Sequence, residues 1–203
     1  MFFVKILLMN EELYEKITDS LVEDGYIVIE NALNGSVSSG LLNVIKDESD
    51  FKKAGISSSD SLRLDATRRR DKTRWLNEDG GAQSEFLAFS EGLREHLNRS
   101  LYLGLKRFES HFAIYEEGDF YEKHFDSFKG ERNRVVTTVY YLNENWSEMG
   151  GGELVVYDEN DKELAQVVPE ANVLIVFMSE KFPHEVLPAK IKRYSIASWF
   201  RVD

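Results

Sequence analysis

Two short stretches decide how the rest of the chain is interpreted: His124-Phe125-Asp126 and Pro183-His184-Glu185-Val186. Side chains alternate along an extended strand, so His124 and Asp126 are expected to point to the same side of it. His184, from a remote strand, can complete a group of three. Two neutral imidazoles and one carboxylate are the ligands that hold ferrous iron on one face of an octahedron and leave the opposite face open.

The His-x-Asp spacing alone is weak evidence for a metal site, because acidic residues are frequent in this chain. A histidine at a strand edge beside a solvated aspartate would explain the spacing equally well. The interpretation therefore depends on the residues that accompany these three.

The composition is that of an ordinary soluble protein with a single domain. A chain of 203 residues can bury roughly 70% of its unfolded surface. The net charge of -11 and the pI near 4.9 argue against nucleic-acid binding, which requires a basic surface. The chain contains no cysteine, which excludes disulfides, thiolate metal ligands and a cysteine nucleophile.

The apolar runs are too short to cross a membrane, which takes roughly 18 residues. The apolar start from Met1 to Met9 contains Lys5 and lacks the basic flank and cleavage site of a signal peptide. We interpret it as a buried first strand, or as an extension before a true start at Met9. We expect a cytoplasmic protein that binds no membrane.

Helical periodicity dominates the first half of the chain. Apolar residues at helical spacing predict helices over about 10–23, 36–46 and 84–103, and 26–29 is expected to be a short strand. Residues 47–60, rich in Ser, Asp and Lys, are expected to form a surface loop. Residues 1–105 would therefore be mostly helical support within one domain that spans 1–203.

Residues 63–75 are the one locally basic segment of this acidic chain. They could form a solvated loop or hairpin, as most charged runs do. They could equally form a mobile arm that contacts a macromolecular substrate of complementary charge. The residues alone leave both explanations open.

From residue 106 onward the helical period ends, and stretches rich in β-branched and aromatic residues follow. Strands are predicted over 108–115, 120–124, 134–142, 153–157, 164–168, 172–177, 184–187 and 193–200. Closely spaced strands with Gly, Asn and Asp turns are typical of an antiparallel jelly roll, the double-stranded β-helix. The expected fold is mainly β with packed helices, in which 106–203 form the core and the N-terminal helices support one sheet.

The chain from about Arg69 to Phe200 resembles the iron(II)- and 2-oxoglutarate-dependent oxygenases, and most of all the prolyl 4-hydroxylases of the oxygen-sensing type and their bacterial relatives. The matching residues follow the family order: Arg69-x-Asp71-Lys72 with Trp75, Ala113-Ile114-Tyr115, His124-Phe125-Asp126, Arg134, Val139-Tyr140-Tyr141-Leu142-Asn143, Trp146, Gly151-Gly152-Glu153-Leu154, Pro183-His184-Glu185-Val186, Arg193-Tyr194-Ser195-Ile196 and Trp199. A chance His-x-Asp would not be accompanied by this series.

The resemblance implies that His124, Asp126 and His184 bind Fe(II), to which 2-oxoglutarate chelates. It implies that Arg193 anchors the far carboxylate of 2-oxoglutarate, since a guanidinium forms a bidentate charged pair that lysine cannot copy. Tyr115 matches a position whose hydroxyl reaches the same carboxylate. The alternative for Arg193 is a surface arginine, and the alternative for Tyr115 is a core aromatic residue.

Other matched residues would surround the co-substrate or the substrate. Tyr141 and Trp199 match positions near the iron and could instead only fill the core. Arg134 matches a substrate-contacting position, although the preceding loop carries one residue more than the family pattern. The segment with Arg69, Asp71 and Trp75 looks like the family's substrate loop. His111, which precedes the motif, is interpreted as structural.

The activity implied by the resemblance is protein prolyl 4-hydroxylation with Fe(II), 2-oxoglutarate and O2, and with ascorbate as a candidate reductant. A peptidyl proline on a translation elongation factor is the first substrate to try. Two alternatives stay open: a related oxygenase acting on a small molecule or nucleobase, and a non-catalytic sensor that binds 2-oxoglutarate and metal. The basic segment favours a polypeptide substrate.

Overall fold

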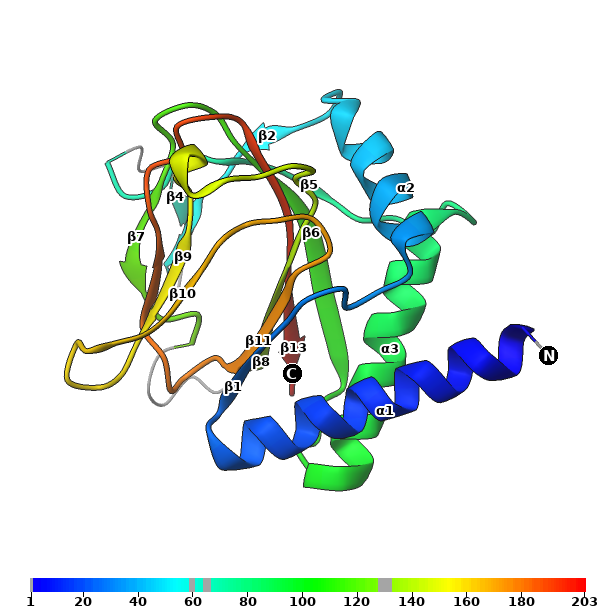
Figure 1. The fold of residues 1–203 in the computed structure, drawn as a ribbon. Coiled ribbons are helices and arrows are strands. Elements are labelled where there is room, and N and C mark those ends of the chain that lie inside the picture. Colours follow the sequence, from blue (N-terminus) through cyan, green and yellow to red (C-terminus); the bar gives the residue numbers. More distant parts are fainter. Residues whose placement is uncertain (1, 59–60, 64–66, 128–132) are drawn as a thin grey trace.

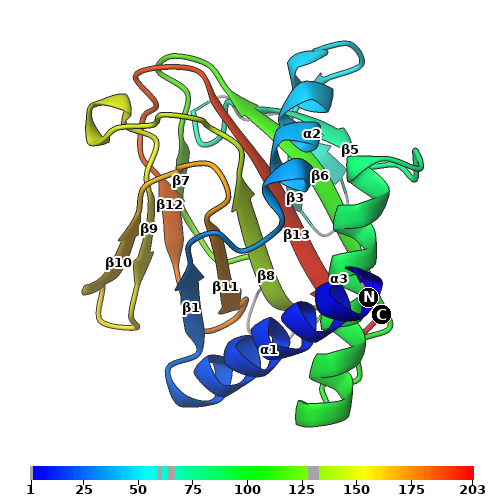
Figure 2. The same cartoon turned by 45° about the vertical axis from the view of Figure 1, so that its right-hand side comes forward.

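The computed structural model describes residues 2–58, 61–63, 67–127 and 133–203. Two antiparallel sheets face each other, and three helices cover the outer face of the larger sheet (Figures 1 and 2). This arrangement is the expected jelly roll with helical support. Within the described chain, no helix is both long and apolar enough to pass through a bilayer.

The strands form one large sheet, one small sheet and a short ribbon. The large sheet runs in the order β1 (Tyr26–Ile29), β11 (Leu174–Met178), β8 (Arg134–Tyr141), β13 (Arg193–Arg201), β6 (Arg107–Tyr115), β5 (Lys72–Trp75) and β2 (Lys52–Lys53). The small sheet runs in the order β10 (Glu163–Val167), β9 (Leu154–Tyr157), β12 (His184–Val186) and β7 (Tyr121–His124). The ribbon pairs β3 (Ile56–Ser58) with β4 (Ser61–Arg63).

The helices are α1 (Phe2–Glu23), α2 (Gly35–Lys46) and α3 (Ala82–Leu101), with a short 3-10 turn, η1 (Glu148–Gly150). The Asn34 side chain caps α2 by accepting a hydrogen bond from the backbone N–H of Ser36, at 3.1 Å. Gly40 lets α2 approach α3 closely, because an added Cβ would lie 2.7 Å from the Cβ of Ala82. The cap fixes the start of α2, and the close approach at Gly40 lets α2 pack against α3.

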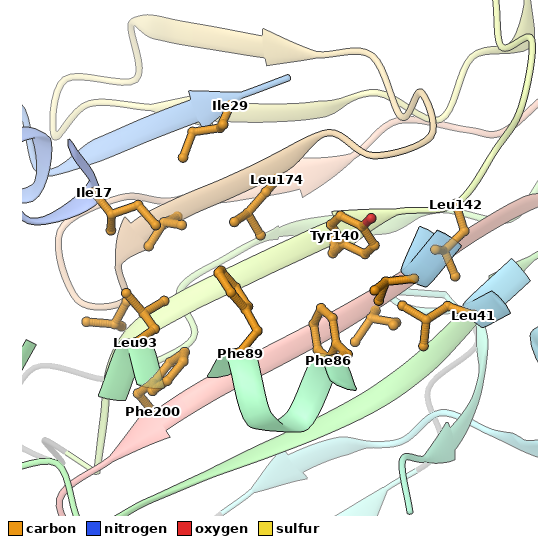
Figure 3. Close-up of a cluster of buried hydrophobic side chains, with 14 of the residues drawn as sticks. Ile17, Ile29, Leu41, Phe86, Phe89, Leu93, Tyr140, Leu142, Leu174 and Phe200 are labelled. Atoms are coloured by element: carbon orange, nitrogen blue, oxygen red, sulfur yellow. The ribbon is translucent and has the colours of Figure 1, made fainter. Parts of the chain in front are cut away.

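Alternation along the central strands divides the core into two layers. On β8, Tyr140 faces the helices and packs with Phe86 and Phe89 of α3 (Figure 3), and Val136 belongs to the same cluster. Val139 and Tyr141, the neighbours of Tyr140 on the same strand, belong to a second cluster, which lies between the sheets. The helix-facing layer fixes the large sheet, and the inner layer is left to form the walls of a cavity.

Two sequence-based expectations were wrong. The start of the chain is not a buried strand, because α1 begins at Phe2; no Gly or Pro interrupts the sequence up to Glu23, so nothing stops the helix. Residues 47–58 are not all loop, because β2 and β3 lie within them; residues 59–60 lie outside the described chain. These short strands show no apolar alternation, and their extended state depends on pairing with β5 and β4.

Residues 68–75 of the basic segment cross from the small sheet to the large one. Backbone hydrogen bonds join Arg70 N to Phe120 O (3.2 Å) and Glu122 N to Arg68 O (2.9 Å), beside β7. A few residues later the same chain becomes β5 and pairs with β6. The described part of the segment is therefore tied to both sheets, while residues 64–66 lie outside the described chain.

Candidate metal centre and anion pocket

The three predicted metal ligands meet between β7 and β12. The two strands pair so that His184 lies directly opposite His124, and Asp126 follows in a bend just after β7 ends. One ligand atom of each residue lies within 4.8 Å of the other two. The Nε2 atoms of His124 and His184 lie 3.7 and 3.5 Å from the two carboxylate oxygens of Asp126.

Backbone carbonyls set the tautomers of both histidines. Nδ1 of His124 donates to the carbonyl of Glu122 at 2.7 Å, and Nδ1 of His184 donates to that of Phe182 at 3.2 Å. With the proton on Nδ1, the lone pair lies on Nε2 and faces the carboxylate. Metal-binding histidines are oriented by this kind of hydrogen bond.

Electrostatics keep the cluster in the protonation state that a metal ion requires. Burial, together with the nearby His184, lowers the pKa of His124 to about 3. Burial opposes ionisation of Asp126, but attraction of its carboxylate to the positively charged forms of His184 and His124 and to the Arg134 guanidinium outweighs burial and holds the pKa of Asp126 below its usual value. A neutral imidazole and a carboxylate are the forms that bind a divalent cation without first losing a proton.

Asp126 is held by a buried pair of hydroxyl groups. Thr137 Oγ1 donates to Asp126 Oδ2 at 2.8 Å, and the Ser179 hydroxyl lies 2.8 Å from the same Thr137 oxygen. The Thr137 and Ser179 side chains are almost completely buried. This support for the carboxylate was missed in the sequence, where the only sign of it is a hydroxyl residue on the inner face of an apolar strand.

A cavity extends from the metal cluster into the space between the sheets, with roughly 460 Å³ of empty volume including part of its mouth. Three neighbouring strands of the large sheet, β8, β13 and β6, supply inward-facing side chains that line this cavity. Arg193 of β13 lies opposite Tyr115 of β6, and further along β13 the residues facing inward are Ser195, Ala197 and Trp199. The small side chains in the middle leave room between Arg193 and the metal cluster.

Arg193 is a buried cation with few hydrogen-bond partners among the described residues. Its side chain is 1% exposed, its Nη1 donates to Ser195 Oγ at 3.1 Å, and its Nε has no hydrogen-bond partner in the described chain. The guanidinium lies 4.7 Å from the ring centre of Tyr115 and 5.0 Å from that of Tyr141. The Tyr141 hydroxyl is also buried without a partner among the described residues.

The donor set at Arg193 fits a carboxylate ligand. A buried charge without a counter-ion is costly, and Asp126 is the one acidic residue among the described residues that line the cavity. A guanidinium, an unpartnered phenol and a serine hydroxyl would all bond to a carboxylate at this end. The cavity thus offers candidate metal ligands at one end and groups that suit an anion at the other, the two features that a chelating dicarboxylate requires.

The predicted substrate-side residues border the same cavity. Arg69 forms a bidentate pair with the fully buried Asp71, at 2.6 and 2.9 Å. The Arg134 guanidinium lies 4.0 Å from the ring centre of Trp199, which lines the cavity. Trp75 is 56% exposed. The structure therefore brings Arg69, Trp199 and the metal ligands to one cavity and places the other predicted residues directly behind or beside them.

Two further cavity residues were not predicted as functional. His111, which we expected to be structural, lines the cavity and contacts the rings of Trp75 and Trp199 at centroid distances of 5.5 and 5.1 Å. Tyr121 also lines it, stacked on His124. Alternation on β6, which places His111 on the same face as Tyr115, was the available signal for His111. Strict alternation would place Tyr121 and His124 on opposite faces of β7, and the irregular pairing of β7 with β12 between these two residues could not be predicted from the sequence.

The chain has relatives among prolyl hydroxylases. The profile of the 2OG-Fe(II) oxygenase superfamily matches residues 110–201. Prolyl hydroxylase EGLN3 of Homo sapiens is 30% identical over 205 residues, covering 92% of this chain and 82% of that protein. Egl nine homolog 1 of Homo sapiens is 34% identical over 140 residues, covering 65% of this chain. The present chain spans only 33% of the length of that second relative.

Solved structures of prolyl hydroxylases also match this chain. A Pseudomonas putida prolyl-4-hydroxylase matches with a TM-score of 0.84 and 34% identity, over 94% of this chain and 99% of that one. A prolyl hydroxylase from Trichoplax adhaerens, in complex with a hypoxia inducible factor oxygen degradation domain peptide fragment, matches with a TM-score of 0.84 and 28% identity, over 96% and 91% of the two chains. The chain therefore belongs to the 2OG-Fe(II) oxygenase superfamily, in the family that contains these prolyl hydroxylases.

Proposed function

We propose that this protein is an Fe(II)- and 2-oxoglutarate-dependent peptidyl-prolyl 4-hydroxylase. The observation that carries the proposal is one cavity with a His-Asp-His cluster at one end and a buried Arg193 without a carboxylate partner at the other. Each end fits one part of the same co-substrate. The prolyl hydroxylase relatives support a peptide as the substrate class.

In this proposal His124, Asp126 and His184 hold Fe(II). Arg193 binds the far carboxylate of 2-oxoglutarate, assisted by the hydroxyls of Tyr141 and Tyr115. Fe(II) and 2-oxoglutarate, when bound, supply the oxidative decarboxylation with O2 that yields succinate, CO2 and the oxidising power for C–H hydroxylation. Ascorbate is the proposed external reductant.

The chain's own residues position the reactants and exclude water. The Ser179 and Thr137 hydroxyls keep the Asp126 carboxylate oriented toward both imidazoles. The indole of Trp199, covered by Arg134, forms a wall near the metal cluster, and we propose that the target ring lies against it. The peptide would be bordered at the cavity entrance by Arg69, Asp71 and Trp75. These residues belong to the basic segment, which joins the two sheets at one side of the jelly roll.

The test is an anaerobic titration with Fe(II) and 2-oxoglutarate, followed by the visible metal-to-ligand charge-transfer band. The band should form with wild type and not with His184→Ala, and Arg193→Met should need much more 2-oxoglutarate. Iron binding without any band in wild type would contradict the proposal.

The substrate class needs a second experiment. Proline-containing peptides, including those of a translation elongation factor, would be incubated with enzyme, Fe(II), 2-oxoglutarate and ascorbate. Mass spectrometry should show the gain of one oxygen atom on proline together with succinate release. A small molecule turned over with no peptide modified would favour the alternative oxygenase, and the chelate band without any turnover would favour a sensor. A cytoplasmic location stays a prediction.

A further inference from the structure

Tyr121 lies between the basic segment and a metal-ligand imidazole. Its ring stacks on that of His124, with centroids 3.6 Å apart and planes inclined by 18°. The guanidinium of Arg69 lies 4.6 Å from the centre of the same tyrosine ring. Because the imidazole covers one face of the ring at close range, the guanidinium has to occupy the other face.

The outer member of this stack is itself fixed. Arg69 is paired with Asp71 through two hydrogen bonds, and the side chains of these two residues are 12% and 0% exposed. The backbones of Arg69 and Tyr121 also form a β-bridge. A cation held in a largely buried site interacts more strongly with an aromatic face than an exposed one does.

The inner member needs such support, because His124 lies on an edge strand. β7 is the last strand of the small sheet, so regular pairing reaches it only from β12. Among the described residues, the His124 ring makes one hydrogen bond, from Nδ1 to the Glu122 carbonyl, beside its contacts with Asp126 and the His184 ring. His184, by contrast, lies on an inner strand and packs against the edge-on ring of Phe177 at a centroid distance of 4.8 Å.

We propose that Tyr121 is a positioning residue, which holds the imidazole of His124 in its metal-binding orientation and is itself held by the Arg69–Asp71 pair. The inference rests on the metal-binding role proposed above for His124. It makes the segment at the substrate entrance physically continuous with one metal ligand. Loss of the stack should weaken metal binding even when the three ligands are intact.

The test measures metal affinity without turnover. Mn(II), which replaces Fe(II) as a redox-stable probe, is titrated in the presence of 2-oxoglutarate and followed by the electron paramagnetic resonance signal of free Mn(II). Tyr121→Leu should raise the Kd for Mn(II) by about tenfold or more, whereas Tyr121→Phe, which keeps the ring, should stay within about twofold of wild type. Arg70→Gln is the matched control, because Arg70 makes the same kind of contact with Phe120, at 4.8 Å, and neither residue is among the described residues that line the cavity.

A second variant covers the case in which Tyr121→Leu fails to fold. The double substitution Arg69→Gln/Asp71→Asn keeps hydrogen-bonding groups but removes the cation, and it should weaken Mn(II) binding several-fold relative to Arg70→Gln. A purely structural role would lower the melting temperature of the metal-free protein and leave the Kd unchanged. Wild-type affinity in the folded variants would overturn this inference alone, whereas a wild type that binds no Mn(II) would overturn the proposed function as well.

Discussion

Arg193 and Tyr115 lie directly opposite each other on β13 and β6, with the guanidinium 4.7 Å from the centre of the phenol ring. The aromatic face stabilises a cation that has no carboxylate partner among the described residues. Such a contact compensates only part of the cost of burying the charge. The ligand-free protein therefore carries an unfavourable interaction that an anionic ligand would relieve.

This arrangement predicts opposite effects of Arg193→Met on the free and the liganded protein. The free energy of unfolding of the ligand-free protein should stay the same or rise, because an unpaired buried charge is replaced by an apolar side chain. The Kd for 2-oxoglutarate should rise at least about tenfold, because charged hydrogen bonds contribute about 1.5–3 kcal/mol each.

Thermal unfolding with Mn(II), with and without 2-oxoglutarate, checks both effects of Arg193→Met. Arg107→Met is a suitable control, since Arg107 is half-exposed at the far end of β6. An undiminished rise in melting temperature with 2-oxoglutarate in Arg193→Met would show that the anion binds elsewhere.

Thr137→Val should weaken metal binding without changing the three ligands. The substitution keeps the shape of the side chain and removes the hydrogen bond to Asp126 Oδ2. Outer-shell hydrogen bonds of this kind are worth about 10–100-fold in metal affinity. Mn(II) titration of Thr137→Val and Thr138→Val measures the effect, because Thr138 is the next residue on β8 and faces the opposite side of the sheet. Equal Kd values for the two variants would contradict a supporting role of Thr137.

Arg134→Leu should weaken peptide binding and spare 2-oxoglutarate binding. Its guanidinium lies over Trp199 and also donates to Glu109 Oε1, at 3.0 Å. Arg201 bonds to the same glutamate oxygen at 2.9 Å, so Arg201→Leu perturbs the same ion-pair cluster and serves as the control. Steady-state assays should show a higher KM for the peptide in Arg134→Leu only. An equal rise in both variants would assign the effect to the cluster as a whole.

The strands after residue 106 could be predicted because they are rich in β-branched and aromatic residues and are separated by Gly, Asn and Asp turns. The cluster of His124, Asp126 and His184 could be predicted because the types and order of these residues match a known pattern; the structure brings them together, and their metal-binding role stays a prediction. β5 could not, since Lys72–Trp75 is short and charged and is extended only because it pairs with β6. The apolar start was misassigned because a run without alternation does not distinguish a strand from a helix.

The supporting contacts of the site were beyond sequence reasoning for a related reason. The stack of Arg69 on Tyr121 and the hydrogen bond from Thr137 to Asp126 join residues on different strands. Their existence depends on the register between β7, β8 and the crossing segment, which no local pattern specifies. Ligand types are readable in a sequence, whereas the contacts that orient the ligands require the fold.

The lowered pKa of the buried His111 imidazole predicts that the stability of the protein falls as the pH is lowered. Burial, aided by the Arg69 charge, lowers the pKa of His111 from 6.5 to about 4. As the pH falls through 6.5 the unfolded chain binds a proton at this residue, and the folded protein does not do so until about pH 4. The stability linked to His111 is therefore complete above pH 6.5 and is lost progressively between 6.5 and 4, by at most about 3 kcal/mol.

His111→Gln removes this linkage and leaves the other buried titrating groups in place. Urea unfolding of the metal-free wild type and variant, at several pH values between about 7.5 and 5, isolates the contribution as the difference between the two curves. Wild type should lose more stability than His111→Gln as the pH falls, because only wild type has an imidazole that the fold keeps neutral. Parallel curves would mean that His111 becomes protonated inside the cavity, and the wall formed by Trp75, His111 and Trp199 would then carry a positive charge toward the substrate.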